Sequence, residues 1–398
     1  MKKISKYYFV FILLILFYGK HYGQKLSPYA EISVLTCDPG NQLYSTFGHS
    51  AIRIKDPVLR IDNVYNYGTF NFNTPGFYLK FIKGQLDYML SVAPYRYFIL
   101  SYKKNKRAVK EQVLNLDEKQ KNMMFGMLSL NAMPENRYYR YDFLKDNCST
   151  RVLKIINEAL NGKLKYPDKI TDNEMTYRQM LMPYLEGKDW ERFGINLALG
   201  RPVDKTVSVE EATFLPDYLY LFIEKSRIKT PSKNKPLVKK VNMLYAPAEK
   251  TNIKSLILTP NRVFWSLLIF ILLITLYEIK YGKYFSALDK TFLFIYGLAG
   301  LSILFLWAGT EHSSVVNNQN IIWASPLFFI AAFMIKRNNG NLLNTFFLIY
   351  AILIFIGFIT DLLFIPLFDK AAAPLELIAV LRLSLMYFRI KFTHHMPY

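Results

Sequence analysis

The sequence predicts an exported α+β domain followed by an all-α bundle of about five transmembrane helices. Residues 25–160 alternate polar and apolar side chains in short runs typical of strands, interrupted by two segments with helical spacing. From about Asn261 onward, Leu, Ile and Phe dominate, and charges are confined to short gaps. The chain also begins with an export-type segment, and its 398 residues are enough for two domains.

These changes in composition divide the chain into four segments. We expect a signal peptide or N-terminal anchor at 1–23 and the α+β exported domain at 24–160. A helical extension and linker follow at 161–260, where prolines such as Pro183, Pro202 and Pro216 punctuate the sequence and the basic stretch 233–240 resembles a linker. The transmembrane helical domain covers 261–398.

The first segment has the features of a signal peptide. Two lysines follow Met1, an uncharged stretch of about twelve residues follows them, and small residues such as Gly23 stand near its end. The stretch is short for a spanning helix, which needs about 20 residues. An uncleaved anchor remains the alternative, and either outcome exports the residues that follow.

Several strands can be placed from alternation and turn residues. We expect a first strand at 31–35, ended by a turn at 37–41 that contains proline and glycine. The alternating run at 50–54 and the run at 64–68 suggest a hairpin. A further strand is expected at 108–114.

Two helices complete the exported domain. One is expected at 117–130 and the second at 148–160, where Val152, Ile155 and Ala159 recur at helical spacing. Asp146 or Asn147 would cap the second helix. Strands and helices in this order predict a small antiparallel sheet with helices packed against it.

Five apolar segments follow, each near spanning length except the third. They lie at 262–279, 291–308, 321–335, 342–360 and 372–388. Lysines and arginines occupy alternate gaps: Lys280, Lys283 and Lys290, then Lys336 and Arg337, then Arg389 and Lys391. The other gaps contain Glu311 and His312, then Asp361 and Asp369 with a single lysine, Lys370. Because cytoplasmic loops are rich in Lys and Arg, this alternation places the acidic gaps on the side of the exported domain.

The net charge of +20 does not indicate a nucleic-acid-binding protein. The basic residues form no single helix face, and many flank apolar spans, where they hold topology and attract anionic headgroups. We therefore expect a membrane partner and no nucleic acid. We expect no cofactor and no metal.

Two segments carry residues suited to chemistry. His49 follows Gly48 at the entry of a strand, and Cys148 stands in the first turn of a helix. A helix N-terminus and a neighbouring imidazolium both lower the pKa of a thiol. The thiolate could then attack an acyl carbonyl, with His49 as base and then acid, and backbone amides near Cys148 would stabilise the oxyanion. The alternative is a buried cysteine and a satisfied polar histidine.

The second cysteine, Cys37, leaves three interpretations open. It could form a disulfide with Cys148, act as a second functional thiol, or pack beside the site. We favour packing.

The chain resembles the Lnb family, the lipoprotein N-acyltransferases of the type found in Bacteroidota. The resemblance spans nearly the whole chain. It rests on residues 35–40, 44–54, 65–72, 134–137 and 141–151 of the exported domain, and on 310–312 and 318–323 of the membrane domain.

That resemblance implies a permuted papain-like fold, in which the strand histidine precedes the helix cysteine. His49 matches the histidine and Cys148 the nucleophile. Asn66, on the strand expected beside His49, is the candidate third residue, with Tyr44 and Asp62 as weaker alternatives.

Four residues are candidates for substrate binding: Tyr44, Arg151, His312 and Arg382. His312 lies in a gap on the exported side, and the alternative there is a polar interfacial turn. Arg382 lies inside the fifth apolar segment, where a charge marks a pathway, a headgroup contact or an ion pair made for packing.

The resemblance implies that an acyl chain passes from a membrane phospholipid to Cys148 as a thioester. It then passes to the α-amino group of a diacylglyceryl-cysteine on a lipoprotein. The expected location is the inner (cytoplasmic) membrane, spanned several times, with the catalytic domain on the periplasmic side. The expected partners are the phospholipid donor and the diacylated lipoprotein acceptor.

Two other function classes remain. A cell-wall amidase or peptidase would use the same Cys–His pair, but such a hydrolase needs only an anchor and not several spans. A transporter subunit or scaffold would need neither His49 nor Cys148 in these contexts.

Overall fold

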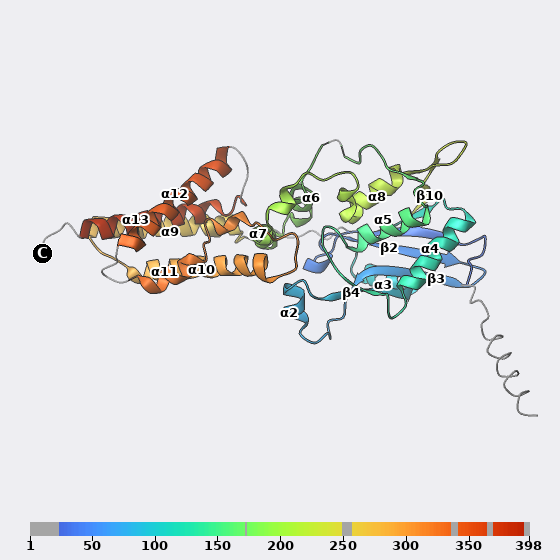
Figure 1. Cartoon of the computed structure of the whole chain (residues 1–398), viewed down its shortest axis with the longest axis horizontal. Coiled ribbons are helices and arrows are strands. Elements are labelled where there is room, and N and C mark those ends of the chain that lie inside the picture. The colour runs from blue at the N-terminus through green and yellow to red at the C-terminus, as the bar shows by residue number, and fades with distance from the viewer. Residues whose placement is uncertain (1–23, 172, 249–256, 336–340, 364–368, 394–398) are drawn as a thin grey trace, which may run out of the picture.

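A computed structural model describes residues 24–171, 173–248, 257–335, 341–363 and 369–393. The signal peptide or anchor expected at 1–23 lies outside these residues, as do Lys336 and Arg337. The molecule is elongated, with an α+β domain at one end and the C-terminal helices at the other (Figure 1). The predicted order of fold classes is confirmed.

The N-terminal domain is built on a seven-stranded antiparallel sheet of order β10-β5-β1-β2-β3-β4-β6. Its strands are β1 (Glu31–Cys37), β2 (His49–Asp56), β3 (Ile61–Thr69), β4 (Asp87–Pro94), β5 (Val109–Leu114), β6 (Tyr138–Arg140) and β10 (Val238–Tyr245). The four strands expected from alternation are present. The first is longer than expected, because Cys37 belongs to β1 and pairs with His49 of β2.

Side chains alternate along each strand, so every strand presents residues to both faces of the sheet. Both faces are covered by helices. Ile32 and Val34 of β1 face a core shared with α4 (Glu118–Asn131) and α5 (Cys148–Ala159). Leu35 and Cys37 face the other side, where α3 (Tyr95–Lys104) packs. A short helix, α2 (Phe77–Ile82), lies between β3 and β4 and projects from the sheet (Figure 1).

The region 161–260 is more than an extension. It contains α6 (Tyr177–Leu181), α7 (Asp189–Ala198) and α8 (Pro216–Lys225), together with a small sheet of β7 (Leu164–Lys165), β8 (Arg227–Ile228) and β9 (Lys235–Pro236). Apolar residues as far along as Leu237 share the core of the main sheet. The expectation of a linker at 233–240 is therefore wrong. Strand β9 and the start of β10 occupy these residues, and β10 pairs with β5.

The C-terminal domain consists of α9 (Pro260–Tyr281), α10 (Ser286–Gly309), α11 (Leu327–Met334), α12 (Asn341–Leu363) and α13 (Ala373–Thr393). Each falls on one of the five predicted apolar segments. Among the described helices, α9, α10 and α12 are long and apolar enough to cross a membrane. The third segment forms only an eight-residue helix, α11, after the turn η5 (Gln319–Ile321).

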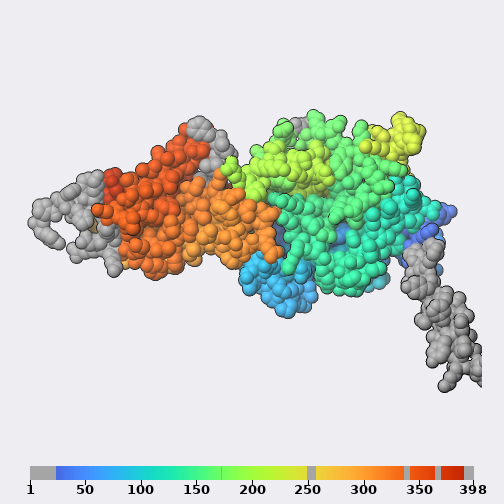
Figure 2. Space-filling model, viewed as in Figure 1, coloured from blue at the N-terminus to red at the C-terminus, as the bar shows by residue number. Residues whose placement is uncertain are grey.

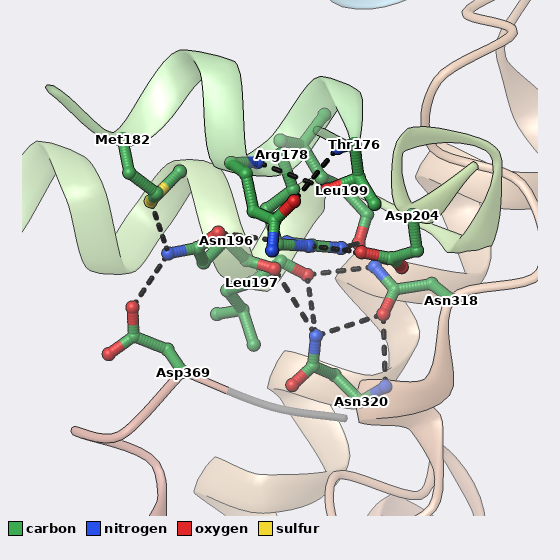
Figure 3. Close-up of polar contacts among 11 residues, drawn as sticks. Thr176, Arg178, Met182, Asn196, Leu197, Leu199, Asp204, Asn318, Asn320 and Asp369 are labelled. Atoms are coloured by element: carbon green, nitrogen blue, oxygen red, sulfur yellow. Dashed lines mark hydrogen bonds and ion pairs between the residues drawn. The ribbon is translucent and has the colours of Figure 1, made fainter. Parts of the chain in front are cut away.

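The junction between the two domains is a network of amide side chains (Figure 3). Asn318 Nδ2 donates to the carbonyl oxygens of Leu197 and Ala198, at the C-terminal end of α7, at 2.8 and 3.1 Å. Asn196 Nδ2 donates to Asp369 Oδ2 at 2.6 Å. Asp369 precedes α13, so this loop lies against the N-terminal domain.

A second contact comes from the loop between α10 and η5, residues 310–318, here called the α10–η5 loop. The amide of Glu311 donates to Lys83 O at 2.9 Å. Glu311 and Asp369 belong to the two acidic gaps, and both contact the N-terminal domain. Their placement agrees with the alternation of charge along the sequence.

Candidate active site

His49 is the first residue of β2, and its position depends on the glycine before it. Gly48 has φ +79°, and a Cβ there would lie 2.9 Å from Cys37 O. Only glycine fits both the left-handed backbone and the close approach to β1. The chain thereby turns into β2 with His49 directed toward the start of α5.

Cys148 is the first residue of α5, and Asn147 is its N-cap. Asn147 Oδ1 accepts hydrogen bonds from the amides of Ser149 and Thr150 at 2.8 and 3.0 Å. Its Nδ2 donates to the carbonyl oxygens of Phe143 and Phe214 at 2.7 and 2.9 Å. The cap thus joins the helix start to the loops on either side and fixes the nucleophile-bearing turn.

The same cap changes the expected oxyanion site. Two amides of the first turn are already bound by Asn147, so they are not free to stabilise a developing negative charge. The amide of Cys148 itself is not bound in this way and is the first-turn donor that remains.

The half-buried His49 imidazole is hydrogen bonded to the buried Cys148 thiol. Burial is the largest single influence on Cys148 and opposes its charge. The charge of His49, together with hydrogen bonds from His49, the Ser50 backbone and Ser149, outweighs burial and lowers the pKa of the Cys148 thiol below its ordinary value. Burial likewise opposes charge on His49, while the Cys148 thiolate and the hydrogen bonds from Cys148 and Asn66 raise the pKa of its imidazole. The pair therefore favours a thiolate and an imidazolium, which is the form that attacks carbonyl carbon.

Asn66 completes the arrangement from β3. Its Oδ1 bonds His49 Nε2. An amide oxygen accepts, so Nε2 carries a proton and the other ring nitrogen is left for the thiol. The three residues expected to act together, Cys148, His49 and Asn66, thus form a continuous row. Asp62, a weaker alternative, instead bonds Arg53 at 2.7 and 2.8 Å.

Two of the expected substrate-binding residues lie near this row. Tyr44 is exposed and meets the ring of Phe70 edge-on at 6.5 Å between centroids. Arg151 makes two hydrogen bonds of 2.6 Å to Asp146, and its guanidinium lies 3.4 Å from the centroid of the Tyr139 ring. These contacts engage Arg151 within the protein.

His312 reaches the N-terminal domain but not the thiol. Its Nε2 lies 3.1 Å from both Phe81 O and Ile82 O, at the C-terminal end of α2. It therefore holds a helix end, which none of the sequence interpretations included.

Arg382 lies far from the site, and the interpretation as a substrate contact is corrected. Its buried guanidinium bonds Glu278 at 2.6 Å and Asp289 at 2.6 and 2.8 Å. Glu278 stands 18 residues after Pro260 in α9, about 27 Å along the helix from the end that adjoins α7. Arg382 therefore forms a buried ion pair that joins helices of the C-terminal domain, which is the packing role given above as an alternative.

Two family models match the chain. The Lnb N-terminal periplasmic domain matches residues 20–182, and the Lnb transmembrane domain matches residues 251–393. The chain belongs to the Lnb family. It is a lipoprotein-related membrane protein of Lnb type with a periplasmic N-terminal part, and membership of this family indicates an enzyme. Comparisons with curated proteins and with solved structures gave no match.

Two further residues line the Lnb site, and one of them, Gly68, was missed from the sequence. Gly68 has φ +83°, and a Cβ there would lie 3.5 Å from Cys148 Cβ and from the ring of Tyr141. Tyr141 stacks on Tyr88, with ring centroids 4.4 Å apart. Gly68 follows Tyr65 and Tyr67 in the strand, and a glycine there was a usable signal that another group approaches the backbone closely. The sequence did not indicate that this group is Cys148.

Cys37 of this Lnb protein is a free, buried thiol. Burial raises its pKa to about 12, so it remains protonated. The disulfide with Cys148 is not formed, and packing beside the site, which we favoured, is what the structure contains. Among the described residues, no three His, Cys, Asp or Glu side chains gather to hold a metal.

Proposed function

We propose that this protein is a lipoprotein N-acyltransferase that uses Cys148 as its nucleophile. The observation that carries the proposal is the hydrogen-bonded row Cys148–His49–Asn66, in which the buried thiol lies at the N-terminus of α5. The acyl donor is a membrane phospholipid, and the acceptor is the α-amino group of a diacylglyceryl-cysteine at the N-terminus of a lipoprotein.

In the first half-reaction, the Cys148 thiolate attacks the ester carbonyl of the phospholipid. A carbon–sulfur bond forms and the ester carbon–oxygen bond breaks. His49 donates its proton to the departing lysophospholipid oxygen, which leaves neutral imidazole and a thioester. The amide of Cys148 stabilises the negative charge on the carbonyl oxygen.

In the second half-reaction, the lipoprotein amine attacks the thioester carbonyl. The neutral His49 accepts a proton from the amine, the new amide bond forms and the carbon–sulfur bond breaks. The site returns to the thiolate and imidazolium with which it began. Asn66 holds the imidazole in one orientation through both steps.

The position of the site supports a lipid donor over a cell-wall peptide. The α10–η5 loop contacts the domain at two places: the Glu311 amide donates to Lys83 O, and Ser313 Oγ donates to Asp142 Oδ2 at 2.5 Å, six residues before Cys148. The thiol is therefore attached to the outer end of a membrane helix, where both substrates are held in the bilayer.

Mass spectrometry of lipoprotein N-termini tests the proposal in cells that depend on this chain. Cys148→Ser and His49→Ala should each abolish conversion of diacylated to triacylated lipoprotein while the protein still accumulates. Cys37→Ala, which removes the other buried thiol, should retain conversion. Full conversion with Cys148→Ser, or cleavage of wall peptides with unchanged lipoproteins, would overturn the mechanism.

A further inference from the structure

Helix α2 exposes large apolar side chains to its surroundings. Tyr78 is 77 % exposed and Leu79 is 57 % exposed, and Phe81 and Ile82 are each nearly half exposed. Phe72, just before the helix, is also exposed. A soluble domain rarely collects so many large apolar residues on one short segment without a partner.

The same segment is fixed beside the membrane domain. His312 Nε2 bonds the last carbonyls of α2, Glu311 bonds Lys83 O, and Gln85 Nε2 donates to Glu311 Oε1 at 2.8 Å. Gly84 has φ +71°, and a Cβ there would lie 3.3 Å from the His312 ring, so glycine permits this contact. Figures 1 and 2 show α2 next to the end of α10.

We propose that α2 inserts its apolar side chains into the outer leaflet of the phospholipid bilayer. The C-terminal end of α10 marks the level of the outer surface of this bilayer, because the 24-residue helix is long enough to span it. Glu311 and His312 follow α10 by two and three residues, so the helix they hold lies at that level. Lys80 and Lys83 supply cations for lipid phosphates at the same height.

Aromatic rings connect this surface to the thiol. Phe77 of α2 meets Phe70 at 5.7 Å between centroids, Phe70 meets Tyr88 at 5.3 Å, and Tyr88 stacks on Tyr141. Tyr141 lies beside Gly68, whose Cα also faces Cys148. These aromatic rings provide an apolar path by which an acyl chain reaches Cys148. The path rests on the proposed function, whereas the contact of α2 with the bilayer does not.

Fluorescence in nanodiscs tests the contact directly. The full chain carries Cys148→Ser and Tyr78→Cys, is labelled with an NBD fluorophore at position 78, and is placed in phosphatidylethanolamine and phosphatidylglycerol. Cys37 is buried and protonated and does not label. The matched control is Tyr29→Cys, a tyrosine 75 % exposed that precedes β1, at the end of the strand opposite Cys37 and His49.

We expect blue-shifted NBD emission at position 78 and at least twofold quenching by lipids that carry a shallow doxyl group. The label at position 29 should be unshifted and unquenched. Equal, weak quenching at both positions would overturn the proposal. A blue shift at position 78 that depends on protein concentration and not on doxyl lipid would identify a second copy of the chain as the occupant and would also overturn it.

Activity separates this inference from the proposed function. In otherwise native protein, Tyr78→Ser with Leu79→Ser should raise the KM for phospholipid several-fold and leave the alkylation rate of Cys148 unchanged. If doxyl quenching occurs but no variant or native protein transfers acyl groups, the proposed function fails and the membrane contact stands. If transfer occurs without quenching, the membrane contact fails and the proposed function stands.

Discussion

The reactivity of Cys148 depends on a few immediate neighbours, and each has a separate effect. His49 supplies the charge that favours the thiolate, Asn66 fixes the imidazole, and Gly68 leaves room for both. The lowered pKa of Cys148 and the raised pKa of His49 both favour the ion pair. It is lost at lower pH by protonation of the thiolate and at higher pH by deprotonation of the imidazolium.

The pH dependence of alkylation tests this ion pair. We expect the rate of Cys148 alkylation by iodoacetamide to titrate below the ordinary pKa of cysteine, and His49→Ala to move the titration to higher pH, because the histidine charge is removed. Asn66→Ala should leave alkylation measurable but lower kcat about tenfold and move the alkaline limb of the acyl-transfer profile to lower pH, because Asn66 helps raise the pKa of His49. Identical titrations in native protein and His49→Ala would contradict the pairing.

Gly68→Ala should impair both stability and chemistry. The left-handed backbone costs about 1–2 kcal/mol for a residue with a Cβ, and the new methyl would occupy the space beside Cys148 and Tyr141, 3.5 Å from each, where it would hinder approach to the thiol. Gly162→Ala is the control, since Gly162 has φ +72° with no atom within 4 Å. Thermal unfolding should detect a similar loss in both variants, whereas only Gly68→Ala should slow alkylation of Cys148.

At the scale of single elements, the N-cap of α5 links stability to reactivity. Asn147→Ala should lower the free energy of unfolding by about 1–2 kcal/mol, because two amides and two carbonyls lose their partner. Asp117 caps α4 with the same capping box and lies away from the thiol. Asp117→Ala should therefore cost about 1 kcal/mol in denaturant unfolding with alkylation of Cys148 unaffected. Equal alkylation rates in both variants would mean that the α5 cap has no part in the site.

Local pattern explains which elements could be predicted. The helix α5 has a cap and helical spacing of Val152 and Ile155, and β2 alternates, so both are evident without the fold. Strand β10 is different, because it is an edge strand with Lys239 and Lys240 facing outward and Pro236 before it. Its pairing with β5, more than 120 residues away, left no local signal.

The same distinction applies to the candidate site. Cys148 and His49 stand at element ends with characteristic neighbours. Asn66 lies within the strand predicted to pair beside His49, and the family resemblance joined Cys148 to both. The contacts of His312 with α2 and of Arg382 with Glu278 join residues 230 and 104 positions apart. No periodicity or turn residue reports such pairs, so their chemistry was known but their partners were not.

At the scale of the whole molecule, Arg382 stabilises the helical domain. Arg382→Ala would leave Asp289 without the cation it shares with Glu278 and leave Glu278 with Arg389 alone, which we expect to destabilise the domain by about 3–5 kcal/mol. Thermal unfolding in detergent should show the loss, while the remaining folded protein keeps its KM for phospholipid. Combining Arg382→Met with Glu278→Gln and Asp289→Asn should recover much of the stability; a raised KM in Arg382→Ala alone would instead restore the substrate-binding interpretation.

Strand β10 also sets the order in which the protein can be completed during its synthesis. Until residue 245 has crossed the membrane, β5 is an uncovered sheet edge, and such edges pair with other chains. The first helix of the C-terminal domain, α9, begins at Pro260, only 15 residues after Tyr245. The periplasmic sheet can therefore close only as α9 enters the translocation channel, so lateral release of that helix into the lipid coincides with completion of the domain that it anchors.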